Sequence, residues 1–386
     1  MKTVCVVSGT RAEYGLLRGV MEGIRQSSVL ELQLAITGTH LSPEFGLTAQ
    51  VIEADGFQID RKVEMLLSSD TAVGITKSMG LGIVGFADTL ADLKPNLILL
   101  LGDRYEIFAV AAAALIARIP VAHLHGGEKT TGAFDEAIRH SVTKMSHLHF
   151  VASEDYRKRV IQLGEDSKKV FNVGGLGVDN ILKTSLLSRG ELETSLGFKL
   201  LERNLLITFH PVTLENNTSA QQMDELLAAL ASLNNTGLVF TMPNADTDGR
   251  ALTKKISEFC SNYHHAHFCT SLGQIKYFSC VHHFDGVIGN SSSGLTEVPT
   301  LKKGTVNIGD RQLGRLNAGS VINCAPEKSS IESALTRLFS ADFREELKTV
   351  KNPYGNGGAS DAIVKILERE SFDDLLKKEF FDIPHN

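Results

Sequence analysis

Residues 123–140, HLHGGEKTTGAFDEAIRH, concentrate histidines, carboxylates, a lysine and an arginine around glycines. Side chains of these types can ligate a metal ion or transfer protons. For a metal site, His123 and His125 alternate along an expected strand and would share one of its faces. No histidine spacing in the chain has the form of a metal-binding helix such as H-E-x-x-H. We therefore favour acid–base chemistry and predict no metal site.

Glu128 and Asp135 are the carboxylates of this segment best placed for acid–base work. Glu128 follows two glycines, which let the backbone approach a ligand closely. The apolar positions of FDEAIRHSVTKMSHL have helical spacing, so Asp135 is expected near a helix N-terminus, which stabilises a carboxylate. The alternatives are that one of these carboxylates is only an N-cap or a partner for Arg139.

Two further strand ends in the first half of the chain carry charged residues. SGTRAEYG (8–15) predicts a tight turn and a helix start beside Arg11, which suits a phosphate, although a plain strand–helix turn is the alternative. GDRYE (102–106) ends a strongly apolar run with Asp103 and Arg104. A self-paired surface cluster with Glu106 is the alternative, but a buried strand that ends in Asp-Arg favours a functional site.

In the second half, the stretch VIGNSSSGLTE (287–297) has a strand–loop–helix pattern that favours diphosphate binding. Backbone N–H groups and the hydroxyls of Ser291 and Ser292 suit the phosphates, and Glu297 suits a ribose diol. A serine-rich loop without a ligand is the alternative. Other residues at or near the expected strand ends of this half are His210, Asn244, Asp246, Asn290, Gly294, Arg311 and Arg315.

Short runs rich in Val, Ile and Leu alternate with helical patterns, as in parallel sheets buried on both faces. These runs are residues 3–9, 32–38, 96–102, 120–126, 148–153 and 170–175, then 204–211, 237–246, 266–271, 286–292, 305–310 and 320–325. We expect an α/β protein with two doubly wound, Rossmann-like domains facing across a cleft, where ligands of such sheets bind. The expected domains are 1–178, completed by a C-terminal helix and tail at 362–386, and 179–361.

Composition excludes several classes of protein. The 386 residues are 42% hydrophobic and 22% charged, as in a globular protein, and a net charge of -6 argues against a nucleic-acid partner. The longest apolar stretch, FAVAAAALIA, is about half of what a membrane span needs, and we expect no membrane partner. Five cysteines without a C-x-x-C pair indicate reduced thiols in a cytoplasm.

Several of these motifs together resemble the UDP-N-acetylglucosamine 2-epimerase family. They are GTRAEYG, LGDRYEIF, HGGEKTTGAFDEAIRHSVTKMSHLHF, FHP, NAD, IGNSSSGLTEVP and NIGDRQLGR, which span nearly the whole chain. The chain looks most like the bacterial hydrolysing branch, which makes N-acetylmannosamine for sialic acid synthesis. The resemblance implies a glycosyltransferase-B-like fold, a UDP-sugar substrate, no cofactor, and a homodimer or homotetramer.

The resemblance also implies roles for individual residues. The residues that would line the nucleotide site are Arg11, Arg104, His210 and Asn244, with Ser291 and Ser292 on the diphosphate, Glu297 on the ribose and Arg311 closing the UDP site. Asp103, Glu128 and Asp135 fall on or beside the family's acidic catalytic positions. Many relatives carry an acid two positions before the Gly-Glu pair, where this chain has His125, so either His125 or Glu128 would act there.

The implied reaction suits these side chains. UDP would depart from sugar C1 while a base removes the proton from C2, giving 2-acetamidoglucal, and water would then add across the double bond. Arg11, His210 and the helix amides near Ser291 would supply donors and positive charge to the leaving diphosphate. A carboxylate whose pKa is raised by burial would serve as the base, and Asp135 would protonate C2 or activate water.

Three rivals remain. The nearest is the same reaction on UDP-2,4-diacetamido-2,4,6-trideoxyglucose. A non-hydrolysing epimerase is disfavoured by the GNSSSG and GDRQLGR forms. A non-catalytic nucleotide-sugar sensor is disfavoured by the carboxylates, since binding UDP alone does not need them.

Overall fold

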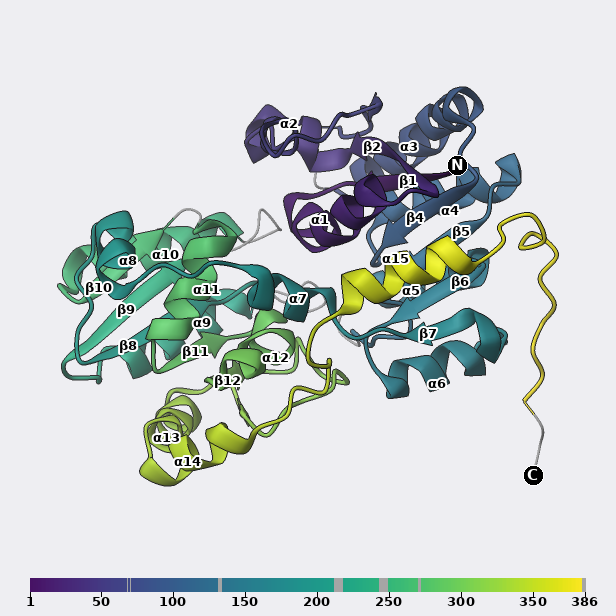
Figure 1. The fold of residues 1–386 in the computed structure, drawn as a ribbon. Coiled ribbons are helices and arrows are strands. Elements are labelled where there is room, and N and C mark those ends of the chain that lie inside the picture. Colours follow the sequence, from purple (N-terminus) through teal and green to yellow (C-terminus); the bar gives the residue numbers. More distant parts are fainter. Residues whose placement is uncertain are drawn as a thin grey trace. The chain divides into compact units, whose positions relative to one another are not determined.

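The structure of the protein is a computed structural model that describes residues 1–67, 69, 71–130, 134–211, 218–242, 249–269 and 272–383 (Figure 1). The chain divides into two compact units. Unit 1 consists of Met1–Glu128, Phe134–Asn180 and Tyr354–Asn386, and unit 2 of Lys129–Ala133 and Ile181–Pro353. No helix in the described ranges is long and apolar enough to cross a membrane.

Unit 1 is built on a seven-stranded parallel sheet in the order β3-β2-β1-β4-β5-β6-β7. Its strands are β1 (Lys2–Ser8), β2 (Leu30–Thr37), β3 (Arg61–Val63), β4 (Leu97–Leu101), β5 (Val121–Leu124), β6 (Leu148–Val151) and β7 (Val170–Asn172). Its helices are α1 (Arg11–Gln26), α2 (Ala49–Ala54), α3 (Ala72–Leu93), α4 (Tyr105–Ala117), α5 (Asp135–Met145), α6 (Glu154–Gln162) and α15 (Ala359–Arg369), with short 3₁₀ turns η1 (Gly38–Leu41), η2 (Pro43–Phe45) and η3 (Ser167–Lys169).

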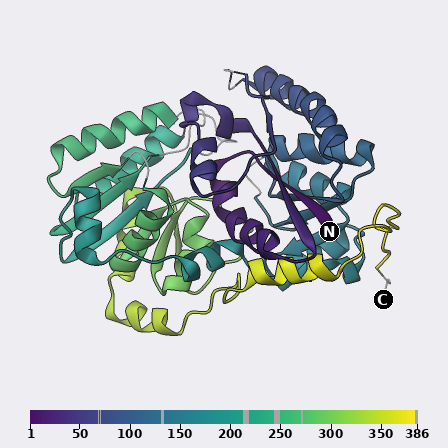
Figure 2. The same cartoon turned by 45° about the horizontal axis from the view of Figure 1, so that its top comes forward.

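Both faces of this sheet are covered, which explains why its strands are continuously apolar. Along β1, Val4 and Val6 pack into a core with α1 and α15, whereas Cys5 and Val7 pack into a second core with α3 and α4. Figure 2 shows α15 and the segment after it, in yellow, running along unit 1. Every strand expected in this half is present. The additional edge strand β3 is too short and too exposed to give an apolar signal.

Unit 2 repeats the pattern with a six-stranded parallel sheet in the order β10-β9-β8-β11-β12-β13. Its strands are β8 (Arg203–Thr208), β9 (Thr236–Thr241), β10 (Ala266–Cys269), β11 (Gly286–Gly289), β12 (Gly304–Ile308) and β13 (Val321–Cys324). Its helices are α8 (Arg189–Leu196), α9 (Ser219–Leu230), α10 (Gly249–Asn262), α11 (Gly273–His283), α12 (Ser293–Thr296), α13 (Lys328–Leu338) and α14 (Ala341–Thr349), with a 3₁₀ turn η4 (Val298–Leu301).

The chain passes between the units at Asn180/Ile181 and Pro353/Tyr354, and the boundaries expected from the sequence are after 178 and before 362. A further helix, α7 (Leu176–Lys183), runs across the first junction. The returning chain joins unit 1 before α15 begins, because the Gly175 N–H donates to the Tyr354 carbonyl at 2.7 Å. The carboxylate of Asp179 then accepts the N–H groups of Ala359 and Ser360, which start that helix.

In each sheet the strand order reverses once, between β1 and β4 in unit 1 and between β8 and β11 in unit 2. Open parallel sheets bind ligands beyond the carboxyl ends of their strands at such a reversal. The loops that leave these four strands begin with Gly9, Gly102, Phe209 and Asn290, respectively. The predicted site residues Arg11, Asp103, Arg104 and His210 lie on these loops or at the helix ends that follow them.

Candidate active site

The turn after β1 places Arg11 at the start of α1. Thr10 is the N-cap of that helix, and its side chain accepts a hydrogen bond from the backbone N–H of Glu13 at 3.3 Å. The carboxyl group of Glu13 accepts from the N–H of Gly9 at 2.7 Å, so the turn is fixed from both sides. The predicted strand–turn–helix is therefore present, with Arg11 exposed as the first helical residue.

Two buried carboxyl groups lie next to this turn. Glu13 and Glu106 are 7% and 0% exposed, and the Arg104 Nε lies 3.2 Å from a carboxylate oxygen of Glu106. Burial, followed by the charge of Glu106, raises the pKa of Glu13 to about 8. Glu13 is therefore protonated near neutral pH, while Glu106 neutralises Arg104. Glu13 is not among the predicted site residues, although its spacing from Thr10 is that of a capping box.

Asp103 is held by a buried arginine. The Nε of Arg139 donates to Asp103 Oδ2 at 3.0 Å, and its Nη1 donates to the Glu128 carbonyl at 2.9 Å and to Glu136 Oε2 at 2.6 Å. The Arg139 side chain is 1% exposed. Arg139 therefore joins the end of β4, the loop after β5 and the first turn of α5. The carboxylates that hydrogen-bond to Arg139 are therefore those of Asp103 and Glu136, whereas the alternative raised from the sequence was a pairing with Glu128 or Asp135.

Asp135 is the first residue of α5. The N-cap is Phe134, which makes no side-chain cap, so the simple N-cap alternative for Asp135 is wrong. Burial and then the negative charge of Asp103 raise the pKa of Asp135 to about 6. A carboxyl group that titrates this close to neutral pH can both take and return a proton.

The loop after β5 does not continue the strand alternation. β5 ends at Leu124, and His125 has a left-handed backbone with φ of 64°. The expectation that His123 and His125 share one strand face is therefore wrong. Instead, the His125 Nδ1 lies 3.1 Å from an oxygen of Glu128, which is 5% exposed, so the two candidate residues at this position form one contact pair. Gly127 has a φ of 78°, and a Cβ at this position would lie only 2.5 Å from the Tyr156 carbonyl oxygen. Glycine therefore allows the loop to pass this close to α6.

The metal alternative loses its geometric basis. Both ring nitrogens of His123 contact protein groups, namely the Gly102 carbonyl at 2.7 Å and the Thr143 hydroxyl at 3.1 Å. Across the part of the chain that the structure describes, no group of three or more His, Cys, Asp or Glu side chains is arranged to hold a metal ion.

In unit 2, Asn290 joins the ends of three strands. Its side chain accepts from the His210 N–H at 2.7 Å and donates to the His210 carbonyl at 2.8 Å. Its own carbonyl accepts from Gln312 Nε2 at 2.8 Å and from Arg311 Nη1 at 3.1 Å. Asn290 was predicted as a ligand-binding residue, but its side chain is occupied in fixing the backbone of His210. Gln312, buried beside Arg311, is not among the predicted residues.

His210 was expected to help supply positive charge to the diphosphate, but the structure favours an uncharged ring. His210 is 9% exposed, and burial followed by the charge of Arg311 lowers its pKa to about 3. In this structure His210 is therefore a neutral imidazole, and the positive charge beside it comes from Arg311. Protonated His210 requires an anion close to the ring, because a nearby negative charge favours the charged form.

The serine loop after β11 has the predicted strand–loop–helix form, ending in the short helix α12. Ser291 and Ser292 are half-buried, and the Ser293 hydroxyl hydrogen-bonds the Glu297 carboxylate. Gly294 has a packing role, because a Cβ there would lie 2.6 Å from Thr305 Cγ2. Asn244 and Asp246 lie outside the described residues.

Comparison with known proteins decides the family. The family model described as UDP-N-acetylglucosamine 2-epimerase matches residues 22–368, most of the chain. The protein belongs to this family. It is 43% identical, over 99% of both chains, to a Campylobacter jejuni protein named GDP/UDP-N,N'-diacetylbacillosamine 2-epimerase (hydrolyzing). It is also 40% identical, over 100% of this chain and 98% of the other, to an Escherichia coli protein named polysialic acid biosynthesis protein P7.

Solved structures with a similar fold include UDP-GlcNAc 2-epimerases. A crystal structure of UDP-GlcNAc 2-epimerase from Neisseria meningitidis bound to UDP-GlcNAc matches with a TM-score of 0.84, covering 96% of this chain and 100% of that chain. At 22% sequence identity this match establishes the fold alone. The predicted α/β fold with two Rossmann-like domains of the glycosyltransferase-B-like type is confirmed.

Proposed function

We propose that this family member is a hydrolysing 2-epimerase of a nucleotide-linked 2,4-diacetamido-2,4,6-trideoxyglucose, which is diacetylbacillosamine. The observation that carries the proposal is the 43% identity, over 99% of both chains, to the Campylobacter jejuni protein named for that activity. The candidate site agrees with a proton-transfer reaction, because Asp135 has a pKa raised to about 6. This substrate was the nearest rival in the sequence interpretation, and the identity supports it better than UDP-N-acetylglucosamine.

The proposed reaction has two stages. A base removes the proton from C2 while the C1–O bond to the nucleotide diphosphate breaks, leaving a double bond between C1 and C2. Water then adds its hydroxyl to C1, and a proton reaches C2 from the opposite face, which inverts that carbon. We assign proton transfer to the carboxyl groups of Asp135 and Glu128, the latter with His125. Asp103, ion-paired to Arg139, raises the pKa of Asp135 and is a third acidic group of this site.

The residues of unit 2 are assigned to the nucleotide diphosphate. Arg311 supplies a guanidinium beside His210, and the hydroxyls of Ser291 and Ser292 lie on the neighbouring loop. The assignment of Arg11 and Arg104 of unit 1 to the nucleotide stays a prediction. A bound diphosphate would raise the pKa of His210 from about 3, which would make the ring a charged donor to the leaving group.

UDP-N-acetylglucosamine remains the second candidate substrate. It is supported by the 40% identity to the Escherichia coli protein named for polysialic acid biosynthesis. The two sugars differ at C4 and C6, where the trideoxy sugar has an acetamido and a methyl group. The reaction at C1 and C2 is the same for both, so only a direct comparison of turnover separates them.

The test is to incubate the protein with each sugar, as the UDP and the GDP derivative, in deuterated water and to follow proton NMR. The proposal requires a free nucleotide and a free 2-epimer that carries deuterium at C2, with higher kcat/KM for the trideoxy sugar. Higher kcat/KM for UDP-N-acetylglucosamine would favour the second candidate. Release of an intact nucleotide-sugar epimer would indicate a non-hydrolysing enzyme, and binding without turnover would indicate a sensor.

Asp135→Asn and Glu128→Gln are expected to reduce kcat strongly while nucleotide binding persists. A matched control is Asp92→Asn, since the Asp92 side chain is 61% exposed in a surface ion pair with Arg61 and should leave kcat unchanged. Wild-type turnover in either site variant would remove that residue from the mechanism. The homodimer or homotetramer implied by the family stays a prediction, to be checked by light scattering.

A further inference from the structure

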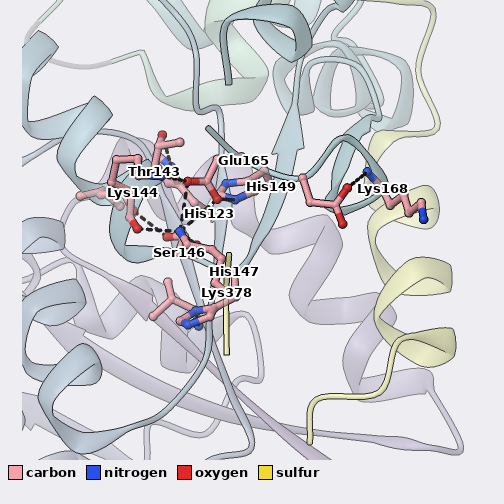
Figure 3. Close-up of polar contacts among 12 residues, drawn as sticks. His123, Thr143, Lys144, Ser146, His147, His149, Glu165, Lys168 and Lys378 are labelled. Atoms are coloured by element: carbon pink, nitrogen blue, oxygen red, sulfur yellow. Dashed lines mark hydrogen bonds and ion pairs between the residues drawn. The ribbon is translucent and has the colours of Figure 1, made fainter. Parts of the chain in front are cut away.

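A buried histidine of unit 1 contacts two of the segments that carry the candidate acidic residues. The His123 side chain of β5, labelled in Figure 3, is fully buried, and its Nε2 lies 2.7 Å from the Gly102 carbonyl. A carbonyl oxygen only accepts, so Nε2 carries the hydrogen and Nδ1 is left as an acceptor. Nδ1 lies 3.1 Å from the Thr143 hydroxyl. Burial lowers the pKa of His123 to about 3, which agrees with a neutral ring.

These two contacts connect the segments that carry the candidate carboxylates. Gly102 immediately precedes Asp103. Thr143 lies one turn after Arg139 on α5, and its single hydroxyl hydrogen is shared between the Arg139 carbonyl, 3.0 Å away, and His123 Nδ1. Since Arg139 binds Asp103, the contacts form a closed ring through His123.

Gly126, in the loop after β5, lies close to both His123 and Thr143. A Cβ on Gly126 would lie 3.0 Å from the Thr143 hydroxyl oxygen and 3.2 Å from His123 Nδ1. Gly126 belongs to the loop that leads to Glu128. The His123 imidazole therefore contacts the end of β4 and the middle of α5, and a side chain at position 126 of the loop after β5 would crowd it.

We propose that His123 is a positioning residue for the proton-transfer step, which sets Asp103 and the first turn of α5 relative to each other. The proposal rests on the proposed function. His123 does not touch the substrate, because the side chain is fully buried and both of its nitrogens contact protein groups. It acts through Gly102 on Asp103, and through Thr143 on the helix that bears Asp135 and Arg139.

The neighbouring strand provides a matched control. His149 on β6 pairs with His123 in the sheet register and is equally buried. Its Nε2 lies 2.8 Å from Glu165, a buried carboxylate that also binds Lys144 and Lys378 (Figure 3). None of the hydrogen bonds of His149 that the structure describes reaches Gly102, Asp103 or Arg139. Replacement of His149 therefore removes a buried histidine of the same sheet without opening the ring.

The experiment compares the full-length wild type with His123→Leu, His123→Gln and His149→Leu. Hydrogen exchange by mass spectrometry on the peptide covering residues 100–106 reports the position of the β4 end without requiring turnover. Faster exchange is expected in His123→Leu, recovery in His123→Gln because its carboxamide N–H can still donate to the Gly102 carbonyl, and wild-type exchange in His149→Leu. Equal exchange in His123→Leu and the wild type would overturn the proposal.

Steady-state kinetics with substrate deuterated at C2 form the second arm. A misplaced base should lower kcat by about 100-fold with little change in KM. It should also increase the isotope effect on kcat, because C2–H cleavage becomes rate-limiting. A loss of kcat without a larger isotope effect, or the same loss in His149→Leu, would show a merely structural role. If His123→Leu does not fold, Thr143→Val takes its place, because it removes the hydroxyl partner of His123. Its hydrogen exchange, kcat and isotope effect are then compared with those of the wild type and His149→Leu.

The two arms separate this proposal from the proposed function. A wild-type protein that turns over neither sugar contradicts the proposed function, while the exchange arm still decides whether His123 positions the β4 end. Turnover with unaltered exchange and isotope effect in the His123 variants contradicts the positioning role alone.

Discussion

Replacement of Asn290 by alanine tests whether its side chain fixes the backbone that follows β8 to the end of β11. Asn290 is 1% exposed, and its carboxamide makes hydrogen bonds of 2.7 and 2.8 Å to the N–H and carbonyl of His210. Alanine removes both partners from these backbone groups. The backbone carbonyl of residue 290 persists, so its contacts with Arg311 and Gln312 are not removed directly.

The magnitude follows from the cost of a buried polar group that loses its partner, about 1–3 kcal/mol. For the two groups of His210 we expect a loss of roughly 2–4 kcal/mol in the unfolding free energy of unit 2, because water can replace part of the lost bonding. Nucleotide affinity should fall as well, since His210 would no longer be fixed beside Arg311. The matched control is Asn323→Ala in the same sheet, where an exposed side chain accepts one hydrogen bond from Asn307, with an expected loss below about 1 kcal/mol.

The measurement is urea unfolding followed by pulsed hydrogen exchange and mass spectrometry. Peptides from β8 and β11 then report unit 2 by itself, which matters because two-domain chains need not unfold in one transition. The chain contains no tryptophan, so intrinsic fluorescence gives a weak signal. An equal, small loss in the Asn290 and Asn323 variants would refute the argument that the His210 backbone depends on Asn290.

Three predictions concern pH. If Asp135, whose pKa is raised to about 6, is the base, kcat should rise with pH through about 6 in the wild type and lose that limb in Asp135→Asn, and an unchanged limb would contradict the assignment. Because burial raises the pKa of Glu13 from 4.5 to about 8, its contribution to stability is complete below about 4.5 and is lost as pH rises through about 8. Glu13→Gln, which keeps an acceptor for Gly9, should therefore unfold at higher urea concentration than the wild type at pH 9, by an amount equivalent to about 1–3 kcal/mol. Burial alone would raise the pKa of Glu165, but His149, Lys144 and Lys378 lower it to about 2. Lys378→Met should therefore destabilise the protein at pH 7, with the difference narrowing as pH falls from 4.5 towards 2, and the exposed Lys377→Met serves as its control.

Much of the fold follows from local patterns. Continuous apolar runs mark strands buried on both faces, and the polar residues that follow them, such as Asp103 and Asn290, must lie at the carboxyl edge of a parallel sheet. The edge strand β3 was not predicted, because Arg61 and Lys62 are exposed there and give no apolar signal. The resemblance to the family was carried by long motifs in both halves and is confirmed.

The candidate site was harder to predict where it depends on distant partners. Arg139 and Asp103 are 36 residues apart, and nothing in either motif shows that they pair. The left-handed backbone of His125 breaks the strand alternation on which the metal alternative was based. Asn290 lies where a ligand-binding residue is expected, but its carboxamide bonds to the backbone of the residue 80 positions earlier.

The sequence by itself determined the strands and helices other than short exposed ones such as β3, the two parallel sheets and the loops on which polar residues gather, because these depend on hydrophobic periodicity along the chain. Only the tertiary structure decided which of these residues are paired and which are protonated. The pKa of a side chain depends on its burial and on charges brought near it by other segments, as Glu13, Asp135 and His210 show. Those quantities arise only when segments far apart in the chain pack together.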